Sequence, residues 1–207
     1  MSARKYDAWL VDLDGTLYTA RWVRLAMAAE LAIFGWSALR TLRRFRHEHE
    51  ALRAELIAGT PLTTEHPNPF VTQLARTSIA LRLPPARVEL LVRDWMLERP
   101  GKWLRRFPRR ALLDEIRAFR ASGGRTALVS DYPAEKKLQA LGARELFDVV
   151  VASGEVPSPR RLKPDPEGYL RAAELLGIEP TRCLVIGDRE DADGAAARAA
   201  NMSFRLV

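Results

Sequence analysis

Short apolar runs alternate with segments of helical periodicity along this chain. Runs of strand length lie at residues 6–13, 125–129, 147–152, 182–186 and 203–207. Near-continuous apolar runs of this kind are typical of strands buried on both faces of a parallel sheet. Helical patterns lie at residues 108–122, 134–142, 165–177 and 194–200. This alternation predicts an α/β fold, a doubly wound and mostly parallel sheet with helices on both faces.

The region after the first predicted strand has a different pattern. Apolar residues recur at helical spacing over residues 25–39, and helical patterns follow at residues 70–82 and 86–99. Segments rich in glycine and proline, such as Gly59-Thr60-Pro61 and Pro84-Pro85, separate these helices. The uneven stretch of residues 95–107 could instead form a hinge strand that leads back to the sheet.

These patterns divide the chain into two parts. We predict a core of residues 1–18 and 108–207, and an all-helical unit of residues 19–107 inserted after the first strand. A chain of 207 residues is long enough for one domain with such an insertion. Residues 22–42 are apolar but contain Arg24 and Glu30, so we expect a helix of the inserted unit and no membrane span.

Composition and charge narrow the function classes. The chain is 47% hydrophobic and 29% charged, which is typical of a folded soluble protein. Its net charge of +7 suits anionic partners, namely phosphorylated metabolites, nucleic acid or an acidic membrane surface. The single cysteine, Cys183, falls within a predicted strand. We interpret it as a buried apolar residue of a cytoplasmic protein in a reducing compartment.

A basic run lies in the middle of the predicted insertion. It consists of Arg40, Arg43, Arg44 and Arg46. We interpret it as a solvated helix face in preference to a substrate contact. His47 and His49 follow, but on a helix they point to different sides, so we expect no metal site there.

Candidate chemistry begins where the first predicted strand ends, at Asp12-Leu13-Asp14-Gly15-Thr16. As the chain leaves the strand, both carboxylates can turn toward one pocket, and paired buried carboxylates favour a divalent cation. Gly15 permits a tight turn, and the hydroxyl of Thr16 can hold that turn in place. Taken alone, the motif fits a plain strand followed by an Asp-Gly turn about equally well.

Three later segments favour the catalytic interpretation. The stretch Leu128-Val129-Ser130-Asp131 ends a strand in a hydroxyl, and Lys163 stands directly before Pro164. The stretch Gly187-Asp188 ends a further strand and leads into an acidic loop. In this order the four segments resemble the haloacid dehalogenase (HAD) superfamily, specifically its phosphatase branch. The resemblance covers about the first 18 residues and the chain from about Arg110 onward.

The resemblance implies a Rossmann-like HAD core under a helical C1-type cap, and it assigns catalytic roles. Asp12 would attack phosphorus and form an aspartyl-phosphate, and Asp14 would serve as general acid and base. Ser130 would hold phosphoryl oxygens, and Lys163 would offset the charge of Asp12 and the phosphate. Relatives that cleave carbon–halogen bonds lack an acid at the position of Asp14, so its presence favours phosphoryl transfer.

The resemblance also implies a Mg²⁺ cofactor. Its ligands would be Asp12, the backbone carbonyl of Asp14, and Asp188. A further acid follows at Asp193, the fifth residue after Asp188, and Asp191 is close enough to compete for the same role.

The expected substrate-binding residues come from the motifs and from the start of the insertion. They are Gly15, Thr16, Tyr18, Arg21, Trp22, Ser130, Asp131 and Lys163. An arginine can hold a second anionic group, and a tryptophan can stack on a ring of the substrate, although Trp22 fits the cap core slightly better.

The function expected from the sequence is Mg²⁺-dependent hydrolysis of a small phosphate monoester through an aspartyl-phosphate on Asp12. Two alternatives stay open. One is a binding protein for nucleic acid or another polyanion on a HAD scaffold. The other is a HAD phosphotransferase or dehalogenase with the same nucleophile. The expected partner is a small phosphorylated metabolite rather than nucleic acid, and the sequence predicts no oligomeric state.

Overall fold

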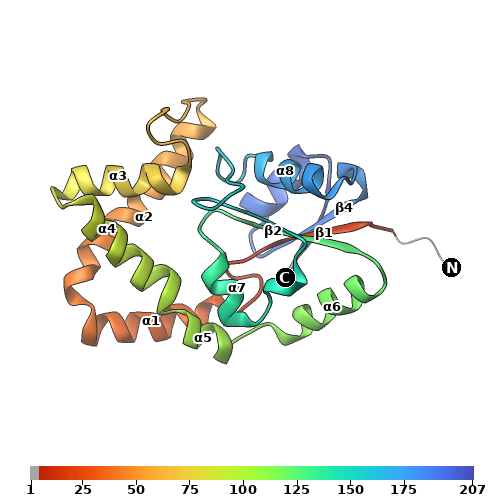
Figure 1. Ribbon diagram of the computed structural model, residues 1–207, viewed down its shortest axis with the longest axis horizontal. Helices are drawn as coiled ribbons and strands as arrows, with labels where there is room; N and C mark the ends of the chain where they lie inside the picture. Colours follow the sequence, from red (N-terminus) through yellow and green to blue (C-terminus); the bar gives the residue numbers. More distant parts are fainter. Residues whose placement is uncertain (1–4) are drawn as a thin grey trace.

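The computed structural model describes residues 5–207 and contains one parallel sheet (Figure 1). Its strands are β1 (Ala8–Asp12), β2 (Arg125–Ser130), β3 (Val149–Ala152), β4 (Cys183–Gly187) and β5 (Ser203–Leu206). They lie in the order β3-β2-β1-β4-β5, and each neighbouring pair is parallel. Successive strands add to one side of β1 and then to the other. In sheets of this type the carboxyl ends near the central strand form the crevice that binds ligands.

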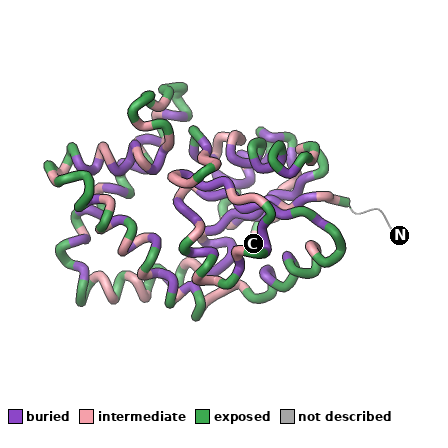
Figure 2. The backbone as a smooth tube through the Cα atoms, viewed as in Figure 1, coloured by how far each residue is buried: buried purple, intermediate pink, exposed green. Residues whose placement is uncertain are grey.

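Helices cover both faces of the sheet. They are α6 (Arg110–Ala121), α7 (Glu135–Leu141), α8 (Glu167–Leu176) and α9 (Ala195–Ala199), with the short turns η2 (Arg144–Leu146), η3 (Pro180–Arg182) and η4 (Glu190–Gly194). On one face, Leu10 of β1 packs in a cluster with Tyr169 of α8. On the other face, Val11 packs with Ile116 of α6 and Leu138 of α7. The doubly wound fold predicted from the alternating pattern is therefore confirmed, and Figure 2 shows its strands buried between the two helical layers.

The segment between β1 and β2 forms a separate group of helices, seen on the left of Figure 1. They are α1 (Ala20–Phe34), α2 (Trp36–Ile57), α3 (Pro69–Leu81), α4 (Pro85–Val92), the π-helix η1 (Arg93–Glu98) and α5 (Gly101–Arg106). These helices have an apolar core of their own, in which Phe45 of α2 packs edge-on against Phe70 of α3, and Trp95 of η1 is buried beside them. An independent apolar core is what allows such an insertion to hold its own shape.

The insertion contacts the core at several places. Outgoing and returning chains pair at Tyr18 and Pro108, where Thr19 N donates to the carbonyl of Phe107 at 2.9 Å. The second contact is made by the carboxyl-terminal half of α2. There Leu56 packs against Leu162 of the core, and the carbonyl of Leu56 accepts a hydrogen bond from Arg161 Nη1 at 3.2 Å.

One local expectation was wrong, and one alternative left open by the sequence does not hold. The helix expected over residues 25–39 is interrupted at Gly35, because the ring of Trp95 lies against this glycine and would stand only 2.3 Å from a Cβ atom there. Residues 95–107 form η1 and α5 rather than a hinge strand.

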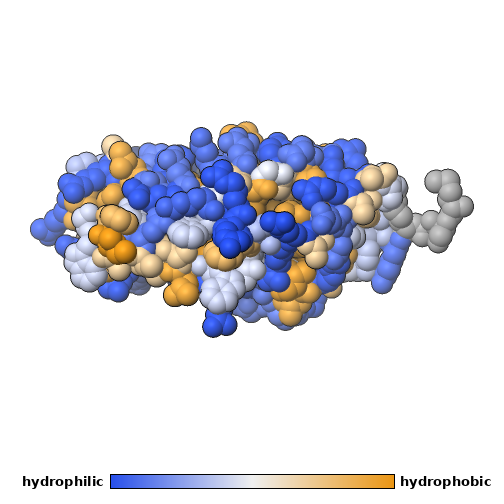
Figure 3. Space-filling view, turned by 90° about the horizontal axis from the view of Figure 1, so that it is seen from below, coloured by the Kyte–Doolittle hydropathy of each residue, from blue (hydrophilic) through white to orange (hydrophobic). Residues whose placement is uncertain are grey.

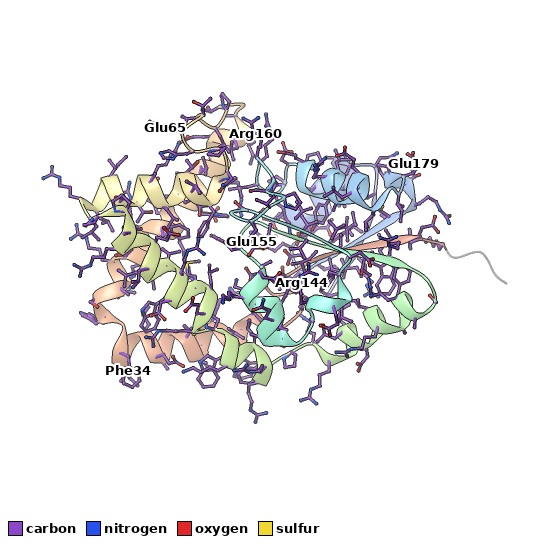
Figure 4. All side chains as sticks on the ribbon, viewed as in Figure 1. Phe34, Glu65, Arg144, Glu155, Arg160 and Glu179 are labelled. Carbon is purple, nitrogen blue, oxygen red and sulfur yellow. The ribbon has the colours of Figure 1, made fainter. Side chains whose placement is uncertain are left out.

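The surface around the junction of α1 and α2 is more apolar than expected. Ile33, Phe34 and Trp36 are 72%, 74% and 74% exposed, and Phe34 points outward at the end of α1 (Figure 4). On the face that Figure 3 shows from below, hydrophobic side chains form separate patches among hydrophilic ones. Within residues 5–207, no helix combines the length and the apolar character that crossing a membrane would require.

Candidate active site

The centre of the site is the carboxylate of Asp12, the last residue of β1. Beyond it the chain turns tightly, with Leu17 N donating to Leu13 O at 3.1 Å and Gly15 at a φ of +97°. Only glycine adopts that backbone conformation without strain. The turn brings Thr16 back over the strand end, where its hydroxyl donates to Asp12 Oδ2 at 2.8 Å. The other oxygen of Asp12 is left for partners from elsewhere in the chain.

Lys163 supplies that partner from the loop between β3 and α8. Its Nζ lies 2.5 Å from Asp12 Oδ1 and 2.8 Å from Asp193 Oδ1, and it also donates to the carbonyl of Val129 at 3.1 Å. The side chain is nearly fully buried. A buried ammonium is stable only when such partners surround it. The hydroxyl of Tyr169 adds a hydrogen bond to Asp193 Oδ1 at 2.8 Å.

Three carboxylates converge at the ends of β1 and β4. Asp12, Asp188 and Asp193 each place an oxygen within 4.8 Å of the others. Burial raises the pKa of Asp12 to about 7; the attraction of Lys163 opposes this shift and the repulsion of Asp193 adds to it. Burial, followed by repulsion from Asp193, also raises the pKa of Asp188. The negative charge of the three ionised carboxylates therefore exceeds the single positive charge of Lys163.

The donor set of this cluster fits a hard divalent cation. Carboxylate oxygens at this spacing are the ligands that Mg²⁺ prefers. The absence of a side chain at Gly15 leaves room for the carboxylate of Asp188, because a Cβ atom at Gly15 would lie 2.0 Å from Asp188 Oδ2. Between the two competing acids the geometry is clear: Asp191 is exposed and pairs with Arg189 at 2.7 Å, whereas Asp193 is buried in the cluster.

Asp14 lies outside this cluster and has partners of its own. Lys137 Nζ of α7 lies 2.6 Å and 2.8 Å from its two oxygens, and the hydroxyl of Tyr18 donates to Oδ1 at 2.5 Å. Burial alone would raise the pKa of Asp14, but the charge and hydrogen bonds of Lys137, together with Tyr18, hold this pKa below its usual value. The two carboxylates of the Asp12-Leu13-Asp14 motif thus have separate lysine partners.

Ser130 and Asp131 follow β2 at the same edge of the sheet. The Ser130 hydroxyl is buried and accepts a hydrogen bond from Tyr132 N at 3.2 Å. Asp131 accepts from the backbone N–H of Lys163 at 3.2 Å and from Arg53 Nη2 of α2 at 3.4 Å. Its carboxylate therefore holds the loop that presents Lys163 and connects this loop to the insertion.

A cavity of about 660 Å³ lies between the inserted helices and this edge of the sheet. The core contributes Asp14, Tyr132 and Lys137 to its lining. Tyr18, which was expected to bind substrate, also lines this cavity, but Arg21 and Trp22 of the insertion do not. Trp22 is 46% exposed and Arg21 stacks over its ring, because this turn of α1 faces solvent.

Sequence reasoning missed Lys137 and Tyr169. Both residues lie on helices that follow the motif-bearing strands, and nothing in the local pattern separates them from other helical residues. The signal that could have found Lys137 is its place seven residues after Ser130, in the first half of a helix that starts at the ligand-binding edge.

Comparison with known proteins assigns the family. A model of the haloacid dehalogenase-like hydrolases matches residues 6–201, almost the whole chain. The chain belongs to this family. The carboxylate cluster of this HAD-like hydrolase lies at the ends of β1 and β4, and its acids belong to the sequence motifs that resemble the family.

Curated relatives of this HAD-like hydrolase match it over shorter regions. It is 39% identical over 89 residues to validoxylamine A 7'-phosphate phosphatase of Streptomyces hygroscopicus subsp. limoneus, a match covering 42% of this chain and 40% of the relative. It is 45% identical over 71 residues to fructose-1-phosphate phosphatase of Escherichia coli, covering 33% and 35%. The aligned part of the chain thus spans well under half of the length of these relatives.

Solved structures match the HAD-like hydrolase over nearly its full length. The L-2-haloacid dehalogenase of Xanthobacter autotrophicus superimposes with a TM-score of 0.64 at 18% identity, covering 98% of this chain and 77% of that one. A HAD-hydrolase of Bacillus subtilis bound to magnesium gives a TM-score of 0.65 at 18% identity, covering 99% and 89%. At this identity the likeness shows a shared fold, including the helical insertion.

Proposed function

We propose that this HAD-like hydrolase hydrolyses a small phosphate monoester, with Asp12 as the nucleophile. The observation that carries the proposal is the position of Asp12. One of its oxygens is held by Thr16 and the other by Lys163, at the meeting point of three carboxylates. A carboxylate fixed in this way is already oriented for attack, so little ordering is left to be done in the transition state.

The proposed reaction has two steps. An oxygen of Asp12 attacks phosphorus while the bond from phosphorus to the leaving oxygen breaks, and Asp14 gives that oxygen a proton. In the second step Asp14 takes a proton from water, the water oxygen attacks phosphorus, and inorganic phosphate leaves as Asp12 is restored. Ser130 would hold phosphoryl oxygens at the end of β2, and Lys163 would offset charge beside Asp12.

We assign the cation of this reaction to Mg²⁺. Asp12, Asp188 and Asp193 would hold it directly or through its water molecules. When bound, it would stabilise charge on the phosphoryl oxygens and relieve repulsion among the carboxylates. Burial and the repulsion of Asp193 raise the pKa values of Asp12 and Asp188, so a bound cation would favour the ionised form of both carboxyl groups.

The inserted helices of residues 19–107 act, in this proposal, as a cap over the core of residues 1–18 and 108–207. Two contacts support the assignment: the paired chains at Tyr18 and Pro108, and the ion pair of Arg53 with Asp131. A cap at this place would exclude water from the phosphoryl group and select the leaving group.

The phosphatase proposal is favoured over the dehalogenase and the phosphotransferase by Asp14 and by the relatives. A halide leaves without a proton, so a dehalogenase has no use for the acid that Lys137 and Tyr18 hold at this position. Both curated relatives described above carry phosphatase names. The expected substrate is accordingly a small phosphorylated molecule.

The test is release of inorganic phosphate from p-nitrophenyl phosphate by the full chain, with Mg²⁺ and with EDTA. We expect turnover only with Mg²⁺, and a loss of at least about 1,000-fold for Asp12→Asn, since an amide is not a nucleophile here. Asp191→Asn is the matched control, because Asp191 is acidic, near the site and outside the cluster. Turnover by Asp12→Asn at the wild-type rate, with the same circular dichroism spectrum, would contradict the mechanism.

A further inference from the structure

We infer that the leaving group of the substrate is a bulky apolar alcohol, such as a long alkyl or an aryl group, rather than a sugar. This inference rests on the proposed phosphatase function and concerns the same site. It follows from the composition of the cavity beside Asp14.

The position of the cavity makes it the leaving-group site. Asp14, the proposed acid for the leaving oxygen, lines it together with Lys137, whereas Asp12, Asp188 and Asp193 do not. A group bonded to the oxygen that Asp14 protonates therefore extends into this cavity. Its volume of about 660 Å³ is ample for a ligand much larger than a phosphate.

The far walls of the cavity are apolar. Met27 and Leu31 of α1, Leu39 of α2, and Trp95 of η1 face it from three helices. A sugar in this space would bury hydroxyl groups against carbon and sulfur atoms, and each hydroxyl without a partner costs on the order of tenfold in affinity. An alkyl chain or aromatic ring gains affinity from the same walls.

The charged lining residues lie toward the core, and one of them, Arg24 of α1, is close enough to Asp188 to act on its pKa. Along α2 the lining residues run in the order Leu39, Leu42, Arg43, Arg46 and Glu50, a span of about 16 Å. The carboxyl-terminal half of α2 reaches the core, where His49 stacks on Tyr132 at 4.7 Å. The apolar residues therefore lie away from the core, and the arginines lie nearer to the phosphoryl site.

This arrangement of charged and apolar lining residues matches a substrate with a phosphate at one end and an apolar group at the other. The positive potential of Arg43 and Arg46 attracts the phosphate end, and the apolar walls accept the rest of the molecule. Two residues of the basic run that the sequence suggested as a solvated face, Arg43 and Arg46, thus also line the cavity.

The first experiment compares substrates under Mg²⁺. We expect kcat/KM to rise from methyl through butyl to octyl phosphate by up to about fourfold for each buried methylene, and to be at least 100-fold higher for octyl phosphate or 2-naphthyl phosphate than for glucose 6-phosphate. The comparison of octyl phosphate with 2-naphthyl phosphate shows whether the cavity prefers an alkyl chain or an aromatic ring. Faster hydrolysis of glucose 6-phosphate than of both apolar esters would overturn the inference.

The second experiment changes one wall. Leu39→Gln should lower kcat/KM for octyl phosphate at least tenfold and leave that for methyl phosphate within twofold, because methyl phosphate does not reach the wall. Leu25→Gln is the matched control, since Leu25 is 60% exposed on α1 and does not line the cavity. Equal losses on both substrates, or no loss on octyl phosphate, would contradict the assignment of this wall.

Binding measurements separate this inference from the proposed function. Octylphosphonate, which cannot be hydrolysed, should bind at least tenfold more tightly than methylphosphonate in calorimetry, and Leu39→Gln should remove most of the difference. If no ester is hydrolysed but this difference is found, the proposed reaction fails and the apolar cavity stands. If esters are hydrolysed and the two phosphonates bind equally, the inference fails and the phosphatase stands.

Discussion

At the scale of single residues, the site is organised by two buried lysines, each paired with one carboxylate of the Asp12-Leu13-Asp14 motif. Lys163 pairs with Asp12 and Lys137 with Asp14. Lysines are rarely buried unless paired, so each of these residues depends on its partner. The pairing gives the proposed nucleophile and the proposed acid different electrostatic surroundings although they are only two residues apart. Burial raises the pKa of Asp12, whereas for Asp14 the effect of burial is outweighed by Lys137 and Tyr18, which hold its pKa below the usual value.

We predict that Lys137 is a positioning residue for Asp14. Lys137→Met should lower kcat by roughly 10- to 100-fold and change KM for methyl phosphate little, because Asp14 loses the group that fixes both of its oxygens. Lys137→Arg should restore part of the loss. The measurement is steady-state kinetics with Mg²⁺, together with a pH profile of kcat, which a purely structural role would leave unchanged.

Lys136→Met is the control, because the neighbouring Lys136 is exposed on the same helix. It should retain wild-type kinetics. Equal losses in the two variants would mean that the charge of α7, and not the contact with Asp14, is responsible.

At the scale of elements, α2 connects the inserted helices to the sheet. Its first half packs within the insertion through Phe45, and its second half meets the core through Leu56 and Arg53. His49 lies at the transition. It is almost fully buried, stacks on Tyr132, and contacts Gln73 and Arg53. Burial, assisted by the charge of Arg53, lowers the pKa of His49 to about 4.

This pKa predicts how stability changes with pH. His49 stays neutral in the folded protein until about pH 4, whereas in the unfolded chain it takes up a proton near pH 6.5. The unfolded state therefore binds more protons between these values, and the free energy of unfolding falls as pH falls through this window, by up to about 3 kcal/mol. Urea unfolding at several pH values measures the slope.

Two variants isolate the histidine. His49→Gln should have a shallower slope than wild type between pH 6.5 and pH 4, whatever its stability at pH 7. His47→Gln, which replaces an exposed histidine two residues earlier on α2, should keep the wild-type slope. A wild-type slope in His49→Gln would show that other groups account for the acid sensitivity.

At the scale of the whole molecule, the described chain brings Asp12, Asp188 and Asp193 together at one end of the sheet from positions far apart in sequence. Like charges at this spacing destabilise the folded state unless a cation is bound. A cation that binds only the folded protein stabilises it by mass action, by about 2.7 kcal/mol at 100 times its dissociation constant.

We therefore predict that Mg²⁺ raises the melting temperature of this protein by roughly 5–10 °C at that concentration. Gly15→Ala should abolish the shift, because the new Cβ would displace the carboxylate of Asp188. Gly59→Ala is matched in backbone strain, since Gly59 also has positive φ, but no atom lies within 4 Å of its Cβ position. Calorimetry should find a lower starting melting temperature and an intact Mg²⁺ shift in Gly59→Ala.

Much of the fold followed from local pattern. The central strands β1 and β4 are almost continuously apolar, and this property is visible in the sequence because strands covered on both faces do not alternate. The positions of Asp12, Ser130 and Asp188 at strand ends followed as well, because parallel strands bring their carboxyl ends to one edge. Asn201 follows the last helix in a left-handed conformation, with a φ of +57°, which agrees with the preference of asparagine for such helix ends.

Other features were decided only by packing between distant segments. The break at Gly35 depends on a tryptophan sixty residues later, Trp95, and the exposure of Trp22 depends on which side of α1 meets the insertion core. The local periodicity of the sequence shows neither that Trp95 packs against Gly35 nor which side of α1 faces the insertion core. The choice of Asp193 over Asp191 likewise depended on Lys163 and Tyr169, which approach from another loop and another helix.

The sequence by itself determined the family, because the acids, the hydroxyl and the lysine of its motifs sit in short segments whose order and residue types are readable along the chain. Tertiary structure alone decided what surrounds those motifs. Lys137 reaches Asp14, and Met27, Leu39 and Trp95 line the cavity beside Asp14, only because helices far apart in sequence are folded against one another. Catalytic motifs are local, whereas a cavity is a property of the space between elements.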